Sequence, residues 1–342
     1  MIVKLKDVCI KGTSNIRQKD VNDSGRYPVY GAAGPVGFMN SFQYDEPYVG
    51  VVKDGAGIGR ATYLPSNSSI IGTMQALIPK KNVLPKYLYY AVSSMHLEKY
   101  YSGATIPHIY FKNYKHERFV LVSKKEQEQI IWRFSLLEKM ISNKQQQLLK
   151  LDELIKARFV EMFGDPIINN KNIKKKKLGD ICLLKAGDFT PSKKISPVKT
   201  SINKYPCFGG NGIRGYVDNY THQGNYSLIG RQGALCGNVK FATGKFRNTE
   251  HAILVSPNIE INSRWLFELL NLEKLNRFRS GAAQPGLAVK TLNEIIVPVA
   301  DLNSQNEYAN FVQQVDKSKV VIQKSLDETQ KLYDSLMQEY FG

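Results

Sequence analysis

The sequence predicts an α+β protein built as a tandem repeat, in which a β-rich globular unit followed by a long α-helix occurs twice. Apolar residues with heptad spacing form a stripe over residues 123–164, which is longer than most helices of globular domains. The landmarks of the first half also return in the second half, at an offset of 205 − 27 = 178 residues for the clearest motif. The predicted segments are globular units at 1–122 and 165–300 and long helices at 123–164 and 301–342.

The first long helix has start and stop signals. Ser123 and Glu126 have the spacing of a capping box, whose side chains accept hydrogen bonds from the first backbone N–H groups. Gly164 can adopt the left-handed turn that ends many helices, and Pro166 cannot continue a helix. About 40 helical residues make a rod of roughly 60 Å. A single apolar stripe along such a rod needs a partner helix to cover it.

The predicted partner is the C-terminal helix over 301–342, whose stripe matches the first at the repeat offset. Polar residues Lys144 and Arg158 interrupt the first stripe, where the second has Ile322 and Leu336. We therefore expect the helices to pack on each other; the alternative is that each lies separately on a globular core. The predicted residues of this helix contact are Ile130, Phe134, Leu137, Ile141, Leu148, Leu151, Ile155, Val312, Val315, Ile322, Leu326 and Leu336.

The repeat is clearest at a glycine-containing motif in each globular unit. Residues 27–31 read Tyr-Pro-Val-Tyr-Gly, and residues 205–209 read Tyr-Pro-Cys-Phe-Gly. Short apolar runs between glycines predict the strands of a β-rich body. A further helix is predicted in each unit, at 85–101 and 263–278. The lysine-rich segment 171–177 is either a phosphate-binding run or a solvated linker.

The composition indicates a polyanionic partner. The 342 residues include 47 Lys and Arg against 30 Asp and Glu, which gives a formal charge of +17. Nucleic acid is the simplest partner for such a surplus; the alternatives are a charge that aids solubility and an acidic protein partner. Because the N-terminus carries lysines and no apolar run of about 18 residues occurs, we expect neither a signal peptide nor a membrane span.

The sequence offers no pattern for catalysis or for a metal site. Carboxylates are not clustered as a metal-dependent nuclease requires, and the glycines of 31–37 match neither a dinucleotide fingerprint nor a P-loop. We therefore expect no catalytic residue, no metal and no cofactor in this chain. Scattered cysteines fit a reducing compartment, so we expect a cytoplasmic protein. The cysteines, none of them in a C-x-x-C pair, are Cys9, Cys182, Cys207 and Cys236.

Basic and amide side chains recur on the glycine-rich loops of both units. Arg and Lys hold phosphates and read guanine, Asn and Gln read adenine, and glycine lets a backbone approach the duplex closely. Lys53 and Arg231 occupy equivalent positions of the repeat, so the two units place basic groups at matching points. The candidate DNA-binding residues are Arg17, Lys19, Lys53, Arg60, Lys193, Lys194, Asn211, Arg214, Arg231, Gln232, Asn238, Lys245 and Arg247.

With these features the chain resembles the specificity (S) subunit of type I restriction–modification systems over essentially its whole length. The resemblance rests on the order of globular unit and long helix and on the motifs at 27–31 and 205–209. Residues 122–127, and residues 298–305 in the second half, are also similar to the family's Pro-Pro-Leu-x-Glu-Gln approach to the helix. The proline pair is absent in both copies, and Ser304 replaces the glutamate in the second.

The resemblance implies that each globular unit is a target recognition domain that reads one half of a split DNA sequence. It implies that the helices pair as an antiparallel coiled coil and act as a spacer between the half-sites. The implied partners are double-stranded DNA and two DNA methyltransferase (M) subunits that methylate adenine, and motor–nuclease (R) subunits can join them. S-adenosylmethionine, ATP and Mg belong to those partners, and the S subunit catalyses nothing. Because the loops of the two units differ, we expect an asymmetric target.

Three other interpretations stay open at this point. One is an S subunit of a methylation-only or single-chain restriction system. Another is a standalone metal-dependent nuclease, which would cut DNA as the purified chain with divalent ions. The third is a coiled-coil scaffold whose basic charge contacts acidic protein or binds DNA without regard to sequence.

Overall fold

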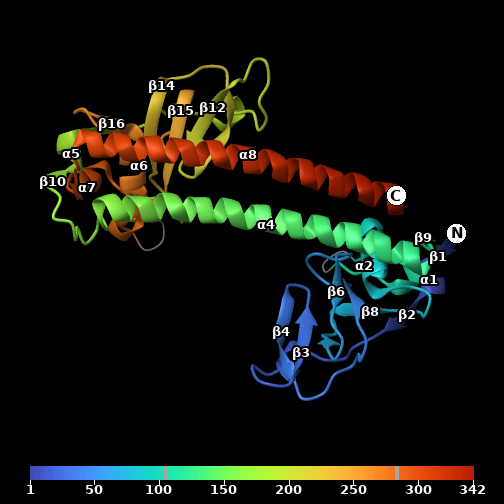
Figure 1. The fold of residues 1–342 in the computed structure, drawn as a ribbon. Coiled ribbons are helices and arrows are strands. Elements are labelled where there is room, and N and C mark those ends of the chain that lie inside the picture. The colour runs from blue at the N-terminus through green and yellow to red at the C-terminus, as the bar shows by residue number, and fades with distance from the viewer. Residues whose placement is uncertain (104–106, 282–284) are drawn as a thin grey trace. The chain divides into compact units, whose positions relative to one another are not determined.

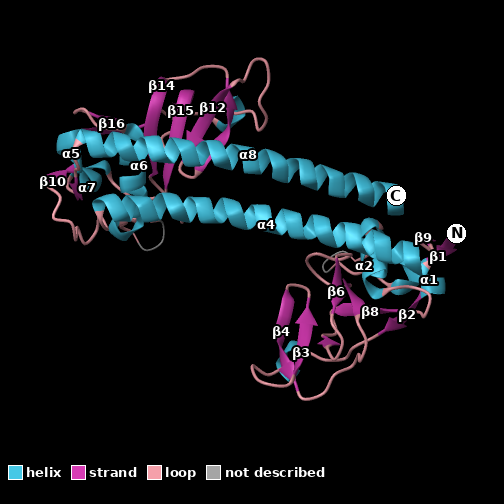
Figure 2. Ribbon diagram, in the orientation of Figure 1, coloured by secondary structure: helices cyan, strands magenta, loops and turns pink. Residues whose placement is uncertain are grey.

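The computed structural model of this chain describes residues 1–103, 107–281 and 285–342. Small sheets and short helices precede each of two long helices (Figure 2). This arrangement confirms the predicted α+β class and the repeated order of β-rich body and long helix. Among the described residues, no helix combines the length and the apolar character needed to cross a membrane.

The contacts within the chain define two compact units. The first comprises Met1–Gln146 and Gln323–Gly342, and the second comprises Gln147–Ile322. The long helices are α4 (Lys124–Phe163) and α8 (Leu302–Phe341). The contacts thus group the chain differently from a division in sequence order, because each unit takes a segment of both long helices.

The body of the first unit is made of small sheets (Figure 1). Its strands are β1 (Ile2–Lys4), β2 (Cys9–Gly12), β3 (Tyr27–Gly31), β4 (Gly34–Met39), β5 (Tyr48–Val52), β6 (Ala61–Leu64), β7 (Ser69–Ile70), β8 (Met74–Pro79) and β9 (Arg118–Val120). Its short helices are α1 (Leu5–Val8), η1 (Gln18–Asp20), α2 (Pro85–Ser94), η2 (Leu97–Tyr100) and α3 (Phe111–Tyr114), where η marks a 3-10 helix. The sheet orders are β2-β8-β5-β6, β4-β3-β7 and β1-β9.

The body of the second unit repeats this plan with longer strands. Its strands are β10 (Lys175–Lys177), β11 (Cys182–Ala186), β12 (Tyr205–Gly209), β13 (Gly212–Val217), β14 (His222–Gly230), β15 (Val239–Asn248), β16 (Ala252–Pro257) and β17 (Ile296–Pro298). Its short helices are α5 (Leu178–Ile181), η3 (Ser192–Lys194), α6 (Ser263–Leu272), η4 (Leu275–Phe278) and α7 (Val289–Asn293). One sheet has the order β11-β16-β14-β15-β12-β13, and β10 pairs with β17.

The repeat extends to individual strand pairings. Tyr27 faces Met39 across β3 and β4, and Tyr205 faces Val217 across β12 and β13. Both hairpins have a register shift at the same point of the motif, and the first strand of each also takes a parallel neighbour. The two bodies therefore share one backbone scaffold, down to its irregularities.

The helices predicted at 85–101 and 263–278 are shorter than expected. α2 and α6 each end early, and a separate 3-10 helix follows after a break. His96 and Lys274 stand at the breaks with φ of 51° and 50°. A residue at positive φ cannot continue a right-handed helix, so these two residues end the predicted helices.

α4 and α8 pack antiparallel in each unit, as the resemblance implied. In the first unit the ring centroid of Phe134, early in α4, lies 5.1 Å from that of Tyr333, late in α8. In the second unit Phe159, late in α4, lies 5.4 Å from Tyr308, early in α8. Every predicted contact residue, including Leu148 in the middle of α4, is buried or half-buried.

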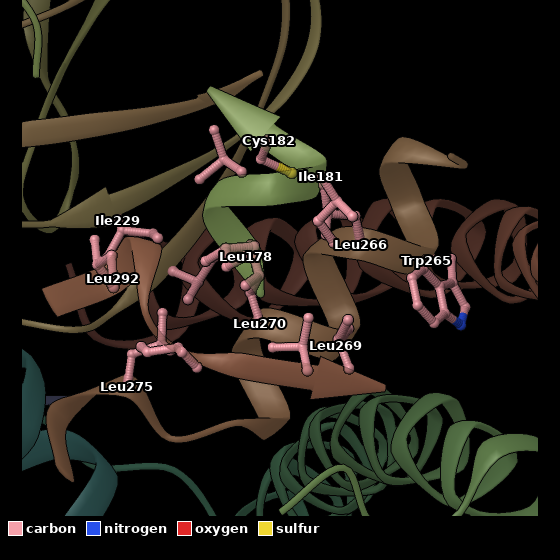
Figure 3. Close-up of a cluster of buried hydrophobic side chains, with 14 of the residues drawn as sticks. Leu178, Ile181, Cys182, Ile229, Trp265, Leu266, Leu269, Leu270, Leu275 and Leu292 are labelled. Carbon is pink, nitrogen blue, oxygen red and sulfur yellow. The ribbon is translucent and has the colours of Figure 1, made fainter. Parts of the chain in front are cut away.

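The long helices pack on each other and also complete the core of each body. Figure 3 shows side chains of α5, α6 and α7 converging in the second unit, among them Leu178, Leu269 and Leu292. Phe159 of α4 joins this cluster, with its ring 6.2 Å from Trp265. A coiled coil of two helices does not need such aromatic residues for its own packing. In this chain they pack the long helix against the sheet-bearing body.

A buried glutamine at the start of each long helix ties the helix to its body. The side-chain oxygen of Gln127 accepts from the N–H of Leu84 at 2.8 Å. Its nitrogen donates to the carbonyls of Asn82 and Val122, both at 3.0 Å. At the start of α8, Gln305 makes two of these bonds at the equivalent positions: its oxygen accepts from the N–H of Asn262 and its nitrogen donates to the carbonyl of Ala300, both at 2.8 Å. This glutamine belongs to the approach motif noted in the sequence, and the structure assigns it a structural role.

Truncation of Phe159 should destabilise the second unit. Phe159 is 1% exposed and Val160 is 42% exposed, so Val160→Ala is the matched control on the same turn. We expect Phe159→Ala to lower the free energy of unfolding by about 3–5 kcal/mol, and the control to change it by about 0.5 kcal/mol or less. Urea unfolding followed by tryptophan fluorescence, in a Trp132→Phe background that leaves Trp265 as the reporter, measures both; equal effects would contradict the packing described.

Replacement of Gln127 by Leu should loosen the start of α4. It leaves the Leu84 N–H and two carbonyls without their partner, which costs about 1–3 kcal/mol. We expect faster hydrogen exchange of the Leu84 amide, measured by NMR or mass spectrometry. Gln129→Leu, at an exposed position of the same turn, should leave that exchange rate unchanged. Unaltered exchange in the Gln127 variant would show that the helix start is held by other contacts.

Candidate nucleic-acid interface

Two glycine-rich loops meet in the second unit. They are the turn 209–212 between β12 and β13 and the loop 231–238 that follows β14. Gly212 has φ of 104°, a conformation that glycine adopts without steric cost. The side-chain nitrogen of Asn238 donates to the side-chain oxygen of Asn211 at 3.2 Å. This bond links the loops and holds two of the candidate residues together.

The two loops form an open pocket of about 480 Å³. Its polar lining includes Asn211, Gln232 and His251, and its apolar lining includes Ile213 and Leu235. Both apolar residues are exposed at the surface. A planar group with hydrogen-bonding edges fits such a lining, because the apolar side chains can contact its face while the amides meet its edge.

Three basic candidates line this pocket or a second, smaller one of the same unit. Arg214, which lines the larger pocket, donates to the hydroxyl of Ser192 at 2.7 Å. Ser192 begins η3, the short helix that carries Lys194. Arg247 donates to the hydroxyl of Thr190 at 3.1 Å, and Arg247 and Lys194 line a smaller pocket of about 130 Å³. Hydrogen bonds to neutral hydroxyls orient these guanidinium groups without neutralising their charge, which suits contacts to phosphate.

The remaining candidates of the second unit lie around this cluster. Lys193 is exposed on η3. Arg231 is half-buried beside the pocket, and its backbone N–H donates to the carbonyl of His251 at 2.9 Å. The ammonium of Lys245 lies 4.8 Å from the ring centre of Tyr220, a cation–π distance.

The candidate residues of the first unit lie farther from one another in the fold than those of the second unit. Arg17 forms an ion pair with Asp20 at 3.4 Å, and its backbone N–H is the main cause of a lowered pKa for that carboxyl. Lys19 is exposed between them. Arg60 donates to the carbonyl of Ala32 and so links the loop 53–60 to the hairpin turn. This bond is the counterpart of the asparagine pair in the second unit, since Arg60 and Asn238 are equivalent in the repeat.

Sequence reasoning missed Asp54, His108 and His251, which lie beside the candidates Lys53 and Gln232 at equivalent loops. The ammonium of Lys53 lies 3.9 Å from Asp54, and Nδ1 of His108 lies 2.7 Å from Oδ1 of Asp54. In the second unit Nδ1 of His251 lies 3.1 Å from Oε1 of Gln232. The sequence contains one signal for Asp54, which is that it aligns with the candidate Gln232 in the repeat. The histidines are lone residues distant in sequence, so no local pattern marks them.

The lysine-rich segment 171–177 is part of the fold rather than a free linker. Its last residues form β10, which pairs antiparallel with β17. Lys177 also donates to Glu294 at 2.8 Å, and this contact is the main cause of a lowered pKa for Glu294.

The described residues show no arrangement for metal chemistry. Across 1–103, 107–281 and 285–342, no group of three or more His, Cys, Asp or Glu is placed to hold a metal ion. The cysteines are buried, and burial raises the thiol pKa of Cys9 and of Cys182 to about 12. Buried neutral thiols are poor ligands and poor nucleophiles.

Comparison with known proteins gives one consistent result. The family model of the type I restriction modification DNA specificity domain matches residues 1–153 and 170–330. The specificity subunit of the type I restriction enzyme EcoprrI from Escherichia coli is 46% identical over 143 residues, which cover 42% of this chain and 36% of that protein. The specificity subunit of the type I restriction enzyme MjaVIII from Methanocaldococcus jannaschii is 22% identical over 325 residues, or 83% of this chain and 76% of that protein.

The fold has a counterpart among solved structures. A type I restriction–modification S subunit from M. genitalium superimposes with a TM-score of 0.69 at 18% sequence identity, covering 100% of this chain and 96% of that one. At this identity the likeness concerns the fold. The family match covers both bodies and most of both long helices, and this chain therefore belongs to the type I restriction modification DNA specificity domain family.

Proposed function

We propose that this chain is the DNA-recognition subunit of a type I restriction–modification complex. Each globular unit reads one half of a split, asymmetric target, and the helix pair sets the spacing between the half-sites. The observation that carries this proposal is the repeated scaffold: the strand registers of the two bodies match, while the side chains on their equivalent loops differ. Two recognition units with the same backbone scaffold but different loop side chains are suited to recognise two different DNA sequences.

The charge and the connection of the two units support this proposal. A surplus of +17 favours contact with the phosphate backbone, which supplies much of the affinity of DNA-binding proteins. Two readers on one chain bind bivalently, because the second contact is intramolecular once the first has formed. A helix of about 40 residues is roughly 60 Å long, so a helix pair of this length suits a spacer.

The chemistry belongs to partner subunits in this proposal. Two methyltransferase subunits bind the chain and methylate adenine with S-adenosylmethionine, and motor–nuclease subunits that use ATP and Mg can join them. The chain itself supplies recognition and catalyses nothing. The complex acts on cellular DNA, so the chain works in the cytoplasm.

Deletion of this chain should remove one split methylation motif from its host. We expect single-molecule sequencing to show N6-methyladenine at a bipartite motif with two different halves, and re-expression of the chain should restore it. A single palindromic motif would contradict the asymmetric target. Cutting of DNA by the purified chain with divalent ions would favour the nuclease alternative, and equal affinity for all sequences would favour the scaffold.

Charges introduced into the helix contact should disturb the spacing between half-sites. Ile141 and Leu148 are half-buried on α4, whereas Gln145 and Gln146 are exposed. We expect the double variant Ile141→Asp, Leu148→Asp to lose its preference for one spacer length in selection from a library of duplexes with varied spacers. The control Gln145→Asp, Gln146→Asp adds the same charge outside the contact and should keep that preference. Unchanged spacing in the first variant would contradict the spacer role.

A further inference from the structure

The same loop position of both units carries a polar side chain held by a histidine. Asp54 and Gln232 are equivalent in the repeat. His108 contacts Asp54 with 2.7 Å between Nδ1 and Oδ1. His251 contacts Gln232 with 3.1 Å between Nδ1 and Oε1. Each histidine fixes one oxygen of the loop side chain and so orients its other terminal atom.

The two histidines are not copies of one another. At the repeat offset His108 corresponds to Gly286, and His251 corresponds to Thr73. The backbone pairs Asp54 with His108 and Gln232 with Gly286 in the same way, so the scaffold is shared while the histidine comes from a different segment. A histidine contact that recurs at one position without being inherited by the duplication indicates that the orientation of this side chain matters in both units.

These side chains are accessible, and each has a terminal atom that makes no hydrogen bond to the described residues. The side chain of Asp54 is 27% exposed, and its Oδ2 lies 3.9 Å from the Lys53 ammonium; among the described residues this oxygen accepts no hydrogen bond. Gln232 is exposed in the pocket lining, and the described residues give its NH₂ group no hydrogen-bond partner. The other ring nitrogen of His251, Nε2, lies 3.1 Å from Oε1 of Glu250, so both ring nitrogens of His251 have a polar neighbour.

The free atoms have opposite hydrogen-bonding character. A carboxylate oxygen only accepts, so Asp54 Oδ2 needs a donor. In Gln232, Oε1 lies toward Nδ1 of His251 at 3.1 Å, so the NH₂ group is the terminal group left for a ligand; it donates and needs an acceptor. At purine C6 and pyrimidine C4 in the major groove, adenine and cytosine present an amino donor, whereas guanine and thymine present a keto acceptor; N7 of both purines is a further acceptor at a different point of the groove.

We propose that Asp54 and Gln232 determine sequence specificity at one base position in each half-site. Asp54 selects an amino base, adenine or cytosine, and Gln232 selects a keto base, guanine or thymine. His108 and His251 are positioning residues that hold the reading atom toward the base. This inference rests on the proposed function and deepens it. The apolar residues Ile213 and Leu235 beside Gln232 suit the methyl group of thymine.

Two isosteric substitutions test the assignment. Asp54→Asn keeps Oδ1 for His108 and turns the free acceptor into a donor; Gln232→Glu keeps Oε1 for His251 and turns the free donor into an acceptor. We expect each variant to invert the amino-against-keto preference at one position of one half-site, by roughly 5- to 150-fold. The measurement is sequencing of random double-stranded DNA bound by the purified full chain.

A positioning variant and a phosphate control separate base reading from general binding. His108→Phe should weaken the preference at the same position that Asp54→Asn inverts, and leave every other position unchanged. Lys193→Ala, on the exposed face of η3, should weaken binding to all sequences alike. Unfolding curves that match the unaltered chain verify that each variant folds.

The outcomes distinguish this inference from the function on which it rests. An unaltered chain that selects no split sequence overturns both. An unaltered chain that selects a split sequence, with Asp54→Asn and Gln232→Glu changing affinity equally for all sequences, overturns only the assignment of the two reading residues. Inversion at one position in each half-site supports both.

Discussion

The structure of both units depends on the antiparallel packing of α4 against α8. Neither long helix is stable on its own, because its apolar stripe must be covered. Each body in turn lacks a complete core without the helices: in the first unit Phe134 packs on Tyr90 at 4.8 Å, and Phe341, late in α8, packs on Tyr87 at 5.2 Å between ring centroids. Helix pairing and folding of the bodies are therefore one cooperative event in each unit, and residues from both ends of the chain take part in the first.

The polar residues within the helix stripes specify which helices pair. Lys144 donates to the hydroxyl of Thr329 at 2.6 Å and to the carbonyl of Ser325 at 3.1 Å. α4 has Leu151 at the repeat position of Thr329, so a pair of two α4 helices would place this ammonium against a leucine. In the second unit Lys319 donates to Asp152 at 2.5 Å. Such polar contacts cost some stability but favour one partner and one register, which a duplicated chain with two similar stripes requires.

The features that the sequence predicted well are those with a local physical signature. Heptad spacing, a capping box at Ser123 and a motif repeated at a fixed offset each leave a pattern in consecutive residues. The early end of α2 was missed because His96 gives no such signal until its φ is known. The contact between Asp54 and His108 was missed because it joins two single residues of distant segments through an isolated β-bridge, which leaves no pattern in consecutive residues. The basic candidates were predicted one by one, and only the structure shows which of them share a pocket.

The duplication explains how one scaffold can hold two different readers. The strand registers are held by backbone hydrogen bonds, which do not depend on the identity of the loop side chains. Loop residues can therefore diverge at little cost to the sheets, as the change from Asp54 to Gln232 at one repeat position illustrates. The supporting histidine had to be supplied anew from another segment, because the orientation of a reading atom depends on its neighbours rather than on the sheet. Stability thus resides in the repeated backbone, while specificity resides in side-chain contacts that the repeat does not copy.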